Sequence, residues 1–169
     1  IFTQSNEQQK AQDWGYNPND ILVIPVSQTA HYEVLDQYVR QSSDIKSYAT
    51  SAAQIGRSAK SEVAETLTER SSVDAFYVDE HFHTVMELKL VEGSGFNPDM
   101  TDNLDKSVVI NQKLAEAFQA QLYDKITLNN EDFTVIGITQ DIHHRDFFEP
   151  IKPAVFKLSD KESTRFFSI

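Results

Sequence analysis

The stretch that decides the fold is residues 133–156, FTVIGITQDIHHRDFFEPIKPAVF. It opens as an apolar, β-branched run of the kind that forms buried strands. The run stops at Asp141 and the neighbouring His143 and His144. Pro150 and Pro153 then lead into a second short apolar segment. The pattern therefore predicts two strands joined by a polar, proline-containing loop.

The segment just upstream, residues 107–118 (SVVINQKLAEAF), predicts a strand that passes directly into a helix. Asn111 is a good N-cap residue for that helix, because its side chain can accept a hydrogen bond from a free backbone N–H. Leu114 and Phe118 lie one helical turn apart and share a face. This helix is therefore expected to pack on the sheet.

The first half of the chain predicts a βαβ-like unit. Residues 21–26 (ILVIPV) form a strand pattern, and residues 45–53 are the expected returning strand. Residues 29–41 between them have helical spacing, and the expected apolar face comprises Tyr32, Leu35, Tyr38 and Val39. Strand, helix and strand in this order indicate a mixed sheet with covering helices.

The middle of the chain is less regular. Residues 54–72 are polar and are expected to form an exposed loop or a weak helix, whereas residues 73–78 alternate as a strand does. Residues 81–90 predict a short buried helix with a turn-rich exit after it. Residues 125–139 predict a hairpin, since Asn129 and Asn130 tolerate the positive φ of a tight turn. The fold class expected from the whole pattern is α/β (α+β).

The composition excludes several classes of function. The 169 residues carry a net charge of −11, so nucleic-acid backbones and anionic lipid headgroups would be repelled. Without cysteine, a disulfide scaffold, a cysteine-ligated zinc site and a thiol nucleophile are all excluded. No run of about 18 apolar residues is present. A single domain or two small lobes remain as the expected size.

Histidines and carboxylates supply the candidates for a metal site, and these are His81, His83, Asp141, His143 and His144. Imidazole and carboxylate could together hold zinc or another divalent ion. However, no His-x-x-x-His spacing is present, and an i, i+2 pair shares a face only on a strand. The alternative interpretation is structural, with His143 fixing the loop after the 133–139 strand and Asp141 as its partner. We therefore expect neither a metal, nor another cofactor, nor a catalytic residue.

Several of these segments, in this order, resemble the extracytoplasmic core domain of MacB/FtsX-type ABC transporter permeases. The matching segments are residues 15–25, 90–96, 108–115, 135–143 and 149–153. Two positions depart from the family pattern: Ser94 stands where the family has arginine, and Asp124 where it has glycine. The resemblance covers nearly the whole chain, and the departures put local loop details in doubt.

The resemblance implies a two-lobed periplasmic core domain. Residues 1–20 would be a membrane-proximal lead-in, residues 21–79 with 146–169 a discontinuous porter-like lobe, and residues 80–145 an inserted second lobe. The parent would be an inner-membrane permease with four transmembrane helices, and this domain would lie between the first two. Because the chain opens at Ile1 without methionine, we expect it to be a piece of that longer protein.

The resemblance also implies a function and partners. The domain would couple cytoplasmic ATP hydrolysis to export or to mechanotransmission outside the membrane, without catalysis. Its partners would be a second permease copy, a cytoplasmic ABC ATPase and a periplasmic protein, with Phe147 and Phe148 as candidate contact residues. We expect the isolated domain to be a monomer. The alternative function is an extracytoplasmic ligand-binding or sensory domain that uses the cleft between the lobes.

Overall fold

A computed structural model describes residues 14–17, 19–27, 29–57, 59–97, 103–143, 149–159 and 161–169. The described helices are α2 (Thr29–Gln41), α3 (Phe82–Val85) and α4 (Gln112–Phe118), with 3-10 turns at Leu104–Lys106 and Lys161–Ser163. The strands are β1 (Val23–Pro25), β2 (Ala49–Ser51), β3 (Lys60–Glu65), β4 (Arg70–Val78), β5 (Leu90–Gly93), β6 (Ser107–Asn111), β7 (Lys125–Leu128), β8 (Glu131–Thr139), β9 (Ala154–Leu158) and β10 (Phe166–Ser168). The expected mixture of strands and helices is confirmed. Among the residues described, no helix has the length and apolar character needed to cross a membrane.

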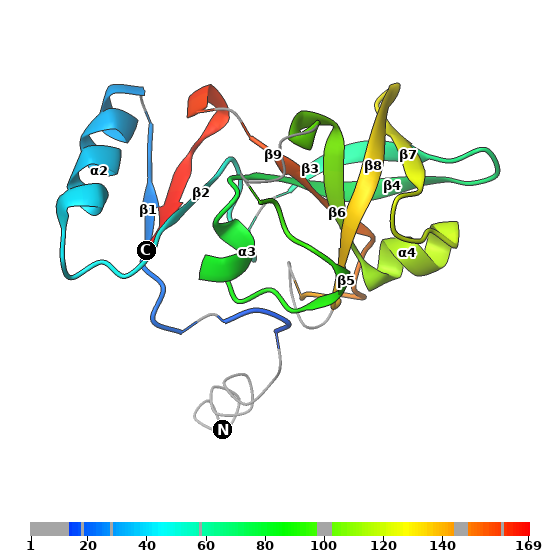
Figure 1. Cartoon of the computed structure of the whole chain (residues 1–169), viewed down its shortest axis with the longest axis horizontal. Coiled ribbons are helices and arrows are strands. Elements are labelled where there is room, and N and C mark those ends of the chain that lie inside the picture. Colours follow the sequence, from blue (N-terminus) through cyan, green and yellow to red (C-terminus); the bar gives the residue numbers. More distant parts are fainter. Residues whose placement is uncertain are drawn as a thin grey trace.

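Six strands close into a ring, which fills the right-hand part of Figure 1. Their order is β4-β3-β7-β8-β6-β9, and β9 returns to pair with β4 in parallel, from Asp74 opposite Ala154 to Val78 opposite Leu158. β5 pairs with β8 beside this ring. Closure leaves the six strands without a long open edge, which stiffens the sheet and protects it from pairing with other chains.

The core of the ring follows the alternation of its strands. On β6, Val108 and Ile110 belong to one apolar cluster, whereas Val109 belongs to a second cluster on the other face. Leu114 and Phe118 of α4 pack onto the first cluster, as their spacing predicts. Along β8, residues 135–138 are also buried, apart from the half-buried Ile136.

Asn111 joins α4 to two strands of the ring. Its Oδ1 accepts hydrogen bonds from the backbone N–H of Leu114 at 3.0 Å and of Ala154 at 2.8 Å. Its Nδ2 donates to the backbone carbonyl of Lys152 at 2.9 Å. The predicted N-cap is therefore confirmed, and the same side chain also fixes the start of β9.

The ring also buries an acid together with its partners. The side chain of Glu62 on β3 is fully buried, and its carboxylate accepts a hydrogen bond from the Tyr77 hydroxyl. The Nζ of Lys157 lies 3.7 Å from one Glu62 oxygen, and that of Lys60 lies 3.4 Å from the other. Burial and the bond to Glu62 together raise the pKa of Tyr77, which stays a hydrogen-bond donor.

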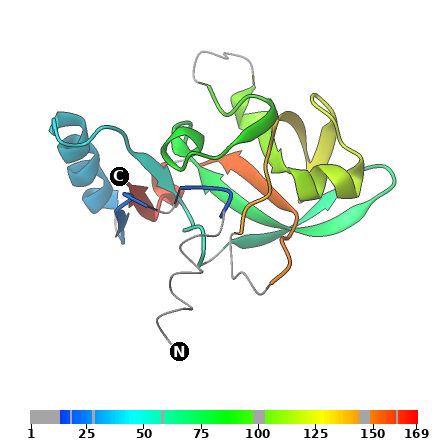
Figure 2. The same cartoon turned by 90° about the horizontal axis from the view of Figure 1, so that it is seen from below.

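The remaining strands form a terminal unit, defined here as β1, α2, β2 and β10. β10 pairs antiparallel with β1 on one side and with β2 on the other, so β1 and β2 run parallel with β10 between them. The expected βαβ-like unit is therefore present with a strand inserted from the end of the chain. Figure 1 and Figure 2 both show α2 and α4 at opposite ends of the molecule.

Helix α2 covers the terminal unit with one face. Tyr32 and Val39 are buried and form a cluster with Phe167 of β10. The expected fourth member of that face, Tyr38, is 65% exposed and does not belong to it. The reason is geometric, since adjacent helical residues differ by roughly 100°, and Tyr38 therefore points away when Val39 points inward.

The terminal unit joins the ring through a short contact between β2 and β4. One register pair connects them, Ser51 opposite Val78, whereas six pairs connect β3 with β4. Two backbone hydrogen bonds extend this contact. The Ala52 N–H donates to the Tyr77 carbonyl at 2.8 Å, and the Asp79 N–H donates to the Thr50 carbonyl at 2.9 Å. This contact and α3 beside it are called the junction below.

Two expectations for the middle of the chain are wrong. Residues 54–72 are neither loop nor helix throughout, since β3 and the start of β4 form a long hairpin there. Its buried positions hold Glu62 and Ala64, so the sequence shows no apolar alternation. The expected turn-rich exit after α3 likewise begins with a strand, β5. Its close approach to β8 requires a glycine at position 137, because an added Cβ would lie 2.1 Å from the Ser94 carbonyl oxygen.

The expected lobe boundaries at residues 79/80 and 145/146 stay a prediction, and the strand pairing sets a condition on them. β3, β4 and β9 belong to the porter-like lobe in that division. Within the same closed ring, β3 is hydrogen-bonded to β7 and β9 to β6, and both β7 and β6 belong to the expected insert. The expected boundaries therefore divide the strands of one closed ring between the two lobes.

Candidate functional site

The junction is organised by the residues that follow β4. The Asp79 carboxylate accepts hydrogen bonds from the backbone N–H of Thr50 at 2.6 Å and of His81 at 3.1 Å. It therefore ties β2 of the terminal unit to the turn that starts α3. Burial raises the pKa of Asp79 to about 6, although the hydrogen bonds from Thr50 act in the opposite direction.

His83 lies inside the junction between aromatic rings. Its ring packs edge-on against Phe96 at 5.6 Å and Phe156 at 5.2 Å, and the residue is 5% exposed. Neither ring nitrogen has a hydrogen-bond partner among the described residues. Burial lowers the pKa of His83 to about 4, so the imidazole is neutral at physiological pH.

The structure separates the two histidines of the expected i, i+2 pair. His83 is buried, whereas His81 is exposed and has Nε2 at 3.9 Å from a carboxylate oxygen of Glu80. The pair lies at the start of a helix, where positions two apart point roughly 200° from each other. His81 and His83 therefore do not converge on one ligand.

The expected partners after β8 are also engaged elsewhere. Asp141 Oδ1 accepts a hydrogen bond from the Lys113 N–H at 2.8 Å, in the first turn of α4. The N–H of His143 donates to the Trp14 carbonyl at 3.0 Å. A bond between Asp141 and His143 stays a prediction. The other named candidates, His144, Phe147 and Phe148, lie outside the described residues.

Within the part of the chain that the structure describes, no group of three or more histidine, aspartate and glutamate side chains is placed to hold an ion. The candidate functional site is a pocket that adjoins α3.

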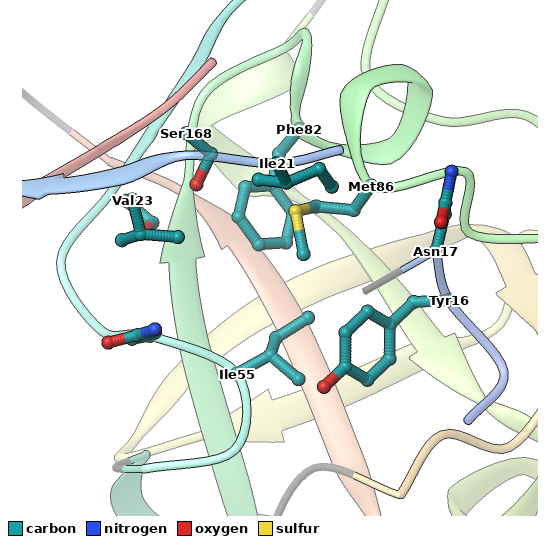
Figure 3. Close-up of a pocket in the computed structure, with 10 residues that line it drawn as sticks. Tyr16, Asn17, Ile21, Val23, Ile55, Phe82, Met86 and Ser168 are labelled. Carbon is teal, nitrogen blue, oxygen red and sulfur yellow. The ribbon is translucent and has the colours of Figure 1, made fainter. Parts of the chain in front are cut away.

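This pocket lies between the junction and residues 16–23, and its volume is about 220 Å³. Figure 3 shows Ile21, Phe82 and Met86 gathered on one side, with Ile55 and Tyr16 on another. The complete lining consists of Tyr16, Asn17, Ile21, Val23, Ser51, Gln54, Ile55, Phe82, Met86 and Ser168. The terminal unit, α3, the loop after β2 and the chain before β1 all contribute to it.

Two contacts hold the segment before β1 in place, one with the end of α3 and one with the chain after β8. The Asn17 N–H donates to the carbonyl of Met86 at 3.0 Å, at the end of α3. Gly15 has φ +77°, and an added Cβ would lie 2.3 Å from the Asp141 carbonyl oxygen. Glycine is therefore required for this close approach, which places Tyr16 against the pocket.

Ser51 supplies a buried hydroxyl to the lining. The residue is 1% exposed, and its Oγ has no hydrogen-bond partner among the described residues. Its carbonyl is occupied, since it accepts a hydrogen bond from the Arg165 N–H at 2.9 Å. The pocket therefore presents one unmatched polar atom at the contact between β2 and β4.

Sequence reasoning missed this pocket, because its lining comes from segments far apart in the chain. Tyr16 lines it from the segment before β1. Ser51, Ile55 and Met86 gave no signal of their own. Gly15 permits a close approach of the backbone, but the residue that it approaches is not visible in the sequence.

Comparison with known proteins identifies the family. The family model described as "MacB-like periplasmic core domain" matches residues 2–158. The chain belongs to this family. The expected resemblance is thereby confirmed, together with the extracytoplasmic character that the family's description gives.

Solved structures agree with this assignment at the level of the fold. The periplasmic region of MacB from Actinobacillus actinomycetemcomitans is similar with a TM-score of 0.61 at 15% identity, over 91% of this chain and 75% of that one. The extracellular domain of the ABC-type transporter YknZ from Gram-positive bacteria gives 0.59 at 14% identity, over 88% and 80%. No curated protein matches the chain.

Proposed function

We propose that this chain is the periplasmic domain of an inner-membrane ABC transporter permease, and that it transmits displacement without catalysing a reaction. In this proposal, ATP hydrolysis in the cytoplasm moves the transmembrane helices, and the domain carries that movement to export or to mechanotransmission outside. The family assignment supports the transporter context. The requirement on the domain is then a packed body that moves as a unit.

The observation that carries this proposal is the pairing of β1 with β10. These strands lie near the two ends of the chain, and Val23 is opposite Ser168 in antiparallel register. Because β1 and β10 are hydrogen-bonded to each other, a displacement that reaches one of these strands would reach both.

The sheet supplies a path from these ends into the body. Along the sheet β10 pairs with β2, and β2 pairs with β4 of the ring. The ring is closed and packed around an apolar cluster, so it would move as a whole rather than bend. The proposed partners are a second permease copy, a cytoplasmic ABC ATPase and a periplasmic protein.

The experiment uses the full-length permease with its ATPase, reconstituted in lipid nanodiscs. The described domain has no cysteine, so spin labels can be placed at chosen sites within it. Labels at the exposed Val34 would report the distance between two copies, and labels at Thr68 and Tyr123, which are both exposed on the ring, would report a distance inside one ring. We expect ATP to change the first distance and to leave the second unchanged.

A flexible Gly-Ser insert tests whether the ends transmit the movement. Placed before Trp14, the insert should suppress the change between copies while ATP hydrolysis continues. Placed at Leu67, which is fully exposed in the β3–β4 turn, the same insert should leave the change intact. An active ATPase with no change in either distance would contradict the proposal.

A further inference from the structure

The pocket beside α3 has a lining that selects against charged molecules. None of its ten lining residues is charged, although the chain contains 41 charged side chains from 15 basic and 26 acidic residues. A charged group entering this space would lose hydration and gain no counter-charge. The occupant that fits is therefore neutral.

The apolar side chains of the lining determine the size and the apolar character of the molecule that fits. Ile21, Ile55, Phe82 and Met86 meet the ring of Tyr16 around the cavity, as Figure 3 shows. Its volume of about 220 Å³ exceeds that of an engineered apolar cavity of about 150 Å³ that binds benzene. One six-membered ring with a small substituent therefore fits the space, whereas a drug-sized molecule does not.

The polar end of the occupant is set by Ser51. A buried hydroxyl without a partner is destabilising, and a ligand group that hydrogen-bonds to it would recover part of that loss. A hydroxyl can both donate and accept, so a phenolic or alcoholic OH is a suitable match. Gln54 and Asn17 offer further uncharged polar groups in the same lining.

From this combination we propose that the pocket is a binding site for small neutral molecules that carry one compact ring and one hydroxyl-type group. The ring lies among Ile55, Phe82 and Met86, and the hydroxyl bonds to Ser51. Because the lining joins the terminal unit to α3 and to residues 16–23, a bound molecule stabilises the junction. The inference does not rest on the proposed transport function.

Phenol is the probe, with toluene and benzoate as comparison molecules of similar size. In an NMR titration of the 169-residue chain, phenol should shift the amide signals of Ser51, Phe82 and Met86 and should saturate. Toluene lacks the hydroxyl and should bind about tenfold more weakly. Benzoate carries a charge and should give no saturable shift.

Two variants and a matched control separate the pocket from the rest of the surface. Ser51→Ala should remove the preference for phenol over toluene. Val23→Phe places a larger side chain in the lining and should abolish phenol binding, whereas Val34→Phe makes the same exchange on the exposed side of α2 and should not. The amide spectra of all three variants report whether they remain folded.

Three outcomes would overturn the inference. The first is that phenol gives no saturable shift up to about 10 mM, a concentration at which even millimolar affinity is visible. The second is that its shifts map away from the lining, and the third is that Val23→Phe binds phenol as the unaltered chain does. None of these results affects the family assignment, which rests on residues 2–158.

Discussion

The ring and the junction differ in how they treat buried polar groups. In the ring, Asn111 makes three hydrogen bonds, and Glu62 has a tyrosine hydroxyl and two lysines around it. In the junction, Ser51 Oγ and both ring nitrogens of His83 lack hydrogen-bond partners among the described residues. Glu62 Oε2 in the ring also lacks a hydrogen-bond partner among the described residues, but the Nζ of Lys157 lies 3.7 Å away and compensates its charge, so the buried polar groups of the junction are the less well satisfied.

The difference shows which part of the domain can change. Regions with few satisfied polar contacts open more readily than a closed core. The junction is also narrow, since β2 and β4 share the register pair of Ser51 and Val78. We infer that the ring moves as one body and that the terminal unit can shift against it at the junction. The following predictions test this contrast.

The largest effect is expected in the ring, from Asn111→Ala. The substitution removes the cap of α4 and leaves the N–H of Ala154 and the carbonyl of Lys152 without their partner. We expect the free energy of unfolding to fall by about 4 kcal/mol, as measured by urea denaturation. Asn130→Gly is the control and should be nearly neutral, because Asn130 is exposed with φ +70°. A loss below about 1 kcal/mol would contradict the role of Asn111.

Asp79 should give the junction a distinctive pH dependence. Its pKa is about 6 in the folded chain against 3.8 when unperturbed, so the folded chain holds more protons between these values. The contribution of Asp79 to the free energy of unfolding should therefore decrease as pH rises through this window, by about 3 kcal/mol in total, which the difference between the unaltered chain and an Asp79 variant measures. Asp79→Asn keeps an oxygen acceptor for Thr50 and should abolish that decrease. Asp44→Asn on the exposed surface should change stability by less than about 0.5 kcal/mol.

His83 should act in the opposite direction. Its pKa is about 4 in the folded chain against 6.5 when unperturbed, so the unfolded chain holds more protons between these values. The contribution of His83 to the free energy of unfolding should therefore increase as pH rises from 4 to 6.5, by about 3 kcal/mol, so that it largely offsets the contribution of Asp79 in the unaltered chain. His83→Phe should remove this increase and, at pH 7, stabilise the fold by about 1 kcal/mol, because no unpaired nitrogen is buried. Destabilisation by His83→Phe at pH 7 would show that the imidazole has a partner.

A smaller effect is expected where the chain before β1 meets the ring. Gly15→Ala puts a Cβ against the Asp141 carbonyl and should release residues 14–17, at a cost of about 2 kcal/mol. Gly56→Ala is a matched control, since Gly56 also has positive φ but the added Cβ would lie 3.8 Å from the Tyr16 hydroxyl oxygen. Calorimetry gives the melting temperatures of both variants. Equal losses would mean that backbone strain alone, and no contact with Asp141, explains the effect.

Local patterns in the sequence predicted most of the ring and of α2. The capping residue Asn111, the asparagine turn before β8 and the apolar runs of β6 and β9 are signals contained within a few residues. β3 could not be predicted in that way, because Glu62 takes an inward position that an apolar residue usually occupies. A buried acid is recognisable only when Tyr77 and Lys157, distant in sequence, are placed beside it.

The candidate site was less predictable for the same reason. The histidines were candidate metal ligands because of their imidazole groups, but His83 packs as a buried aromatic ring against Phe96 and Phe156. The pocket depends instead on Ser51 and Tyr16, whose roles arise from the close approach at Gly15. Such approaches between distant segments are set by tertiary packing, and a single sequence does not display them.

The most direct test of the contrast is native-state hydrogen exchange, measured residue by residue in low concentrations of denaturant. The account predicts that amides of β6, β8 and β9 exchange only through global unfolding. Amides of residues 14–17, 49–51 and 79–88 should exchange through smaller openings, with a lower free energy. Equal free energies in both regions, or an opening that begins in the ring, would contradict the view that the ring moves as one body and the junction yields.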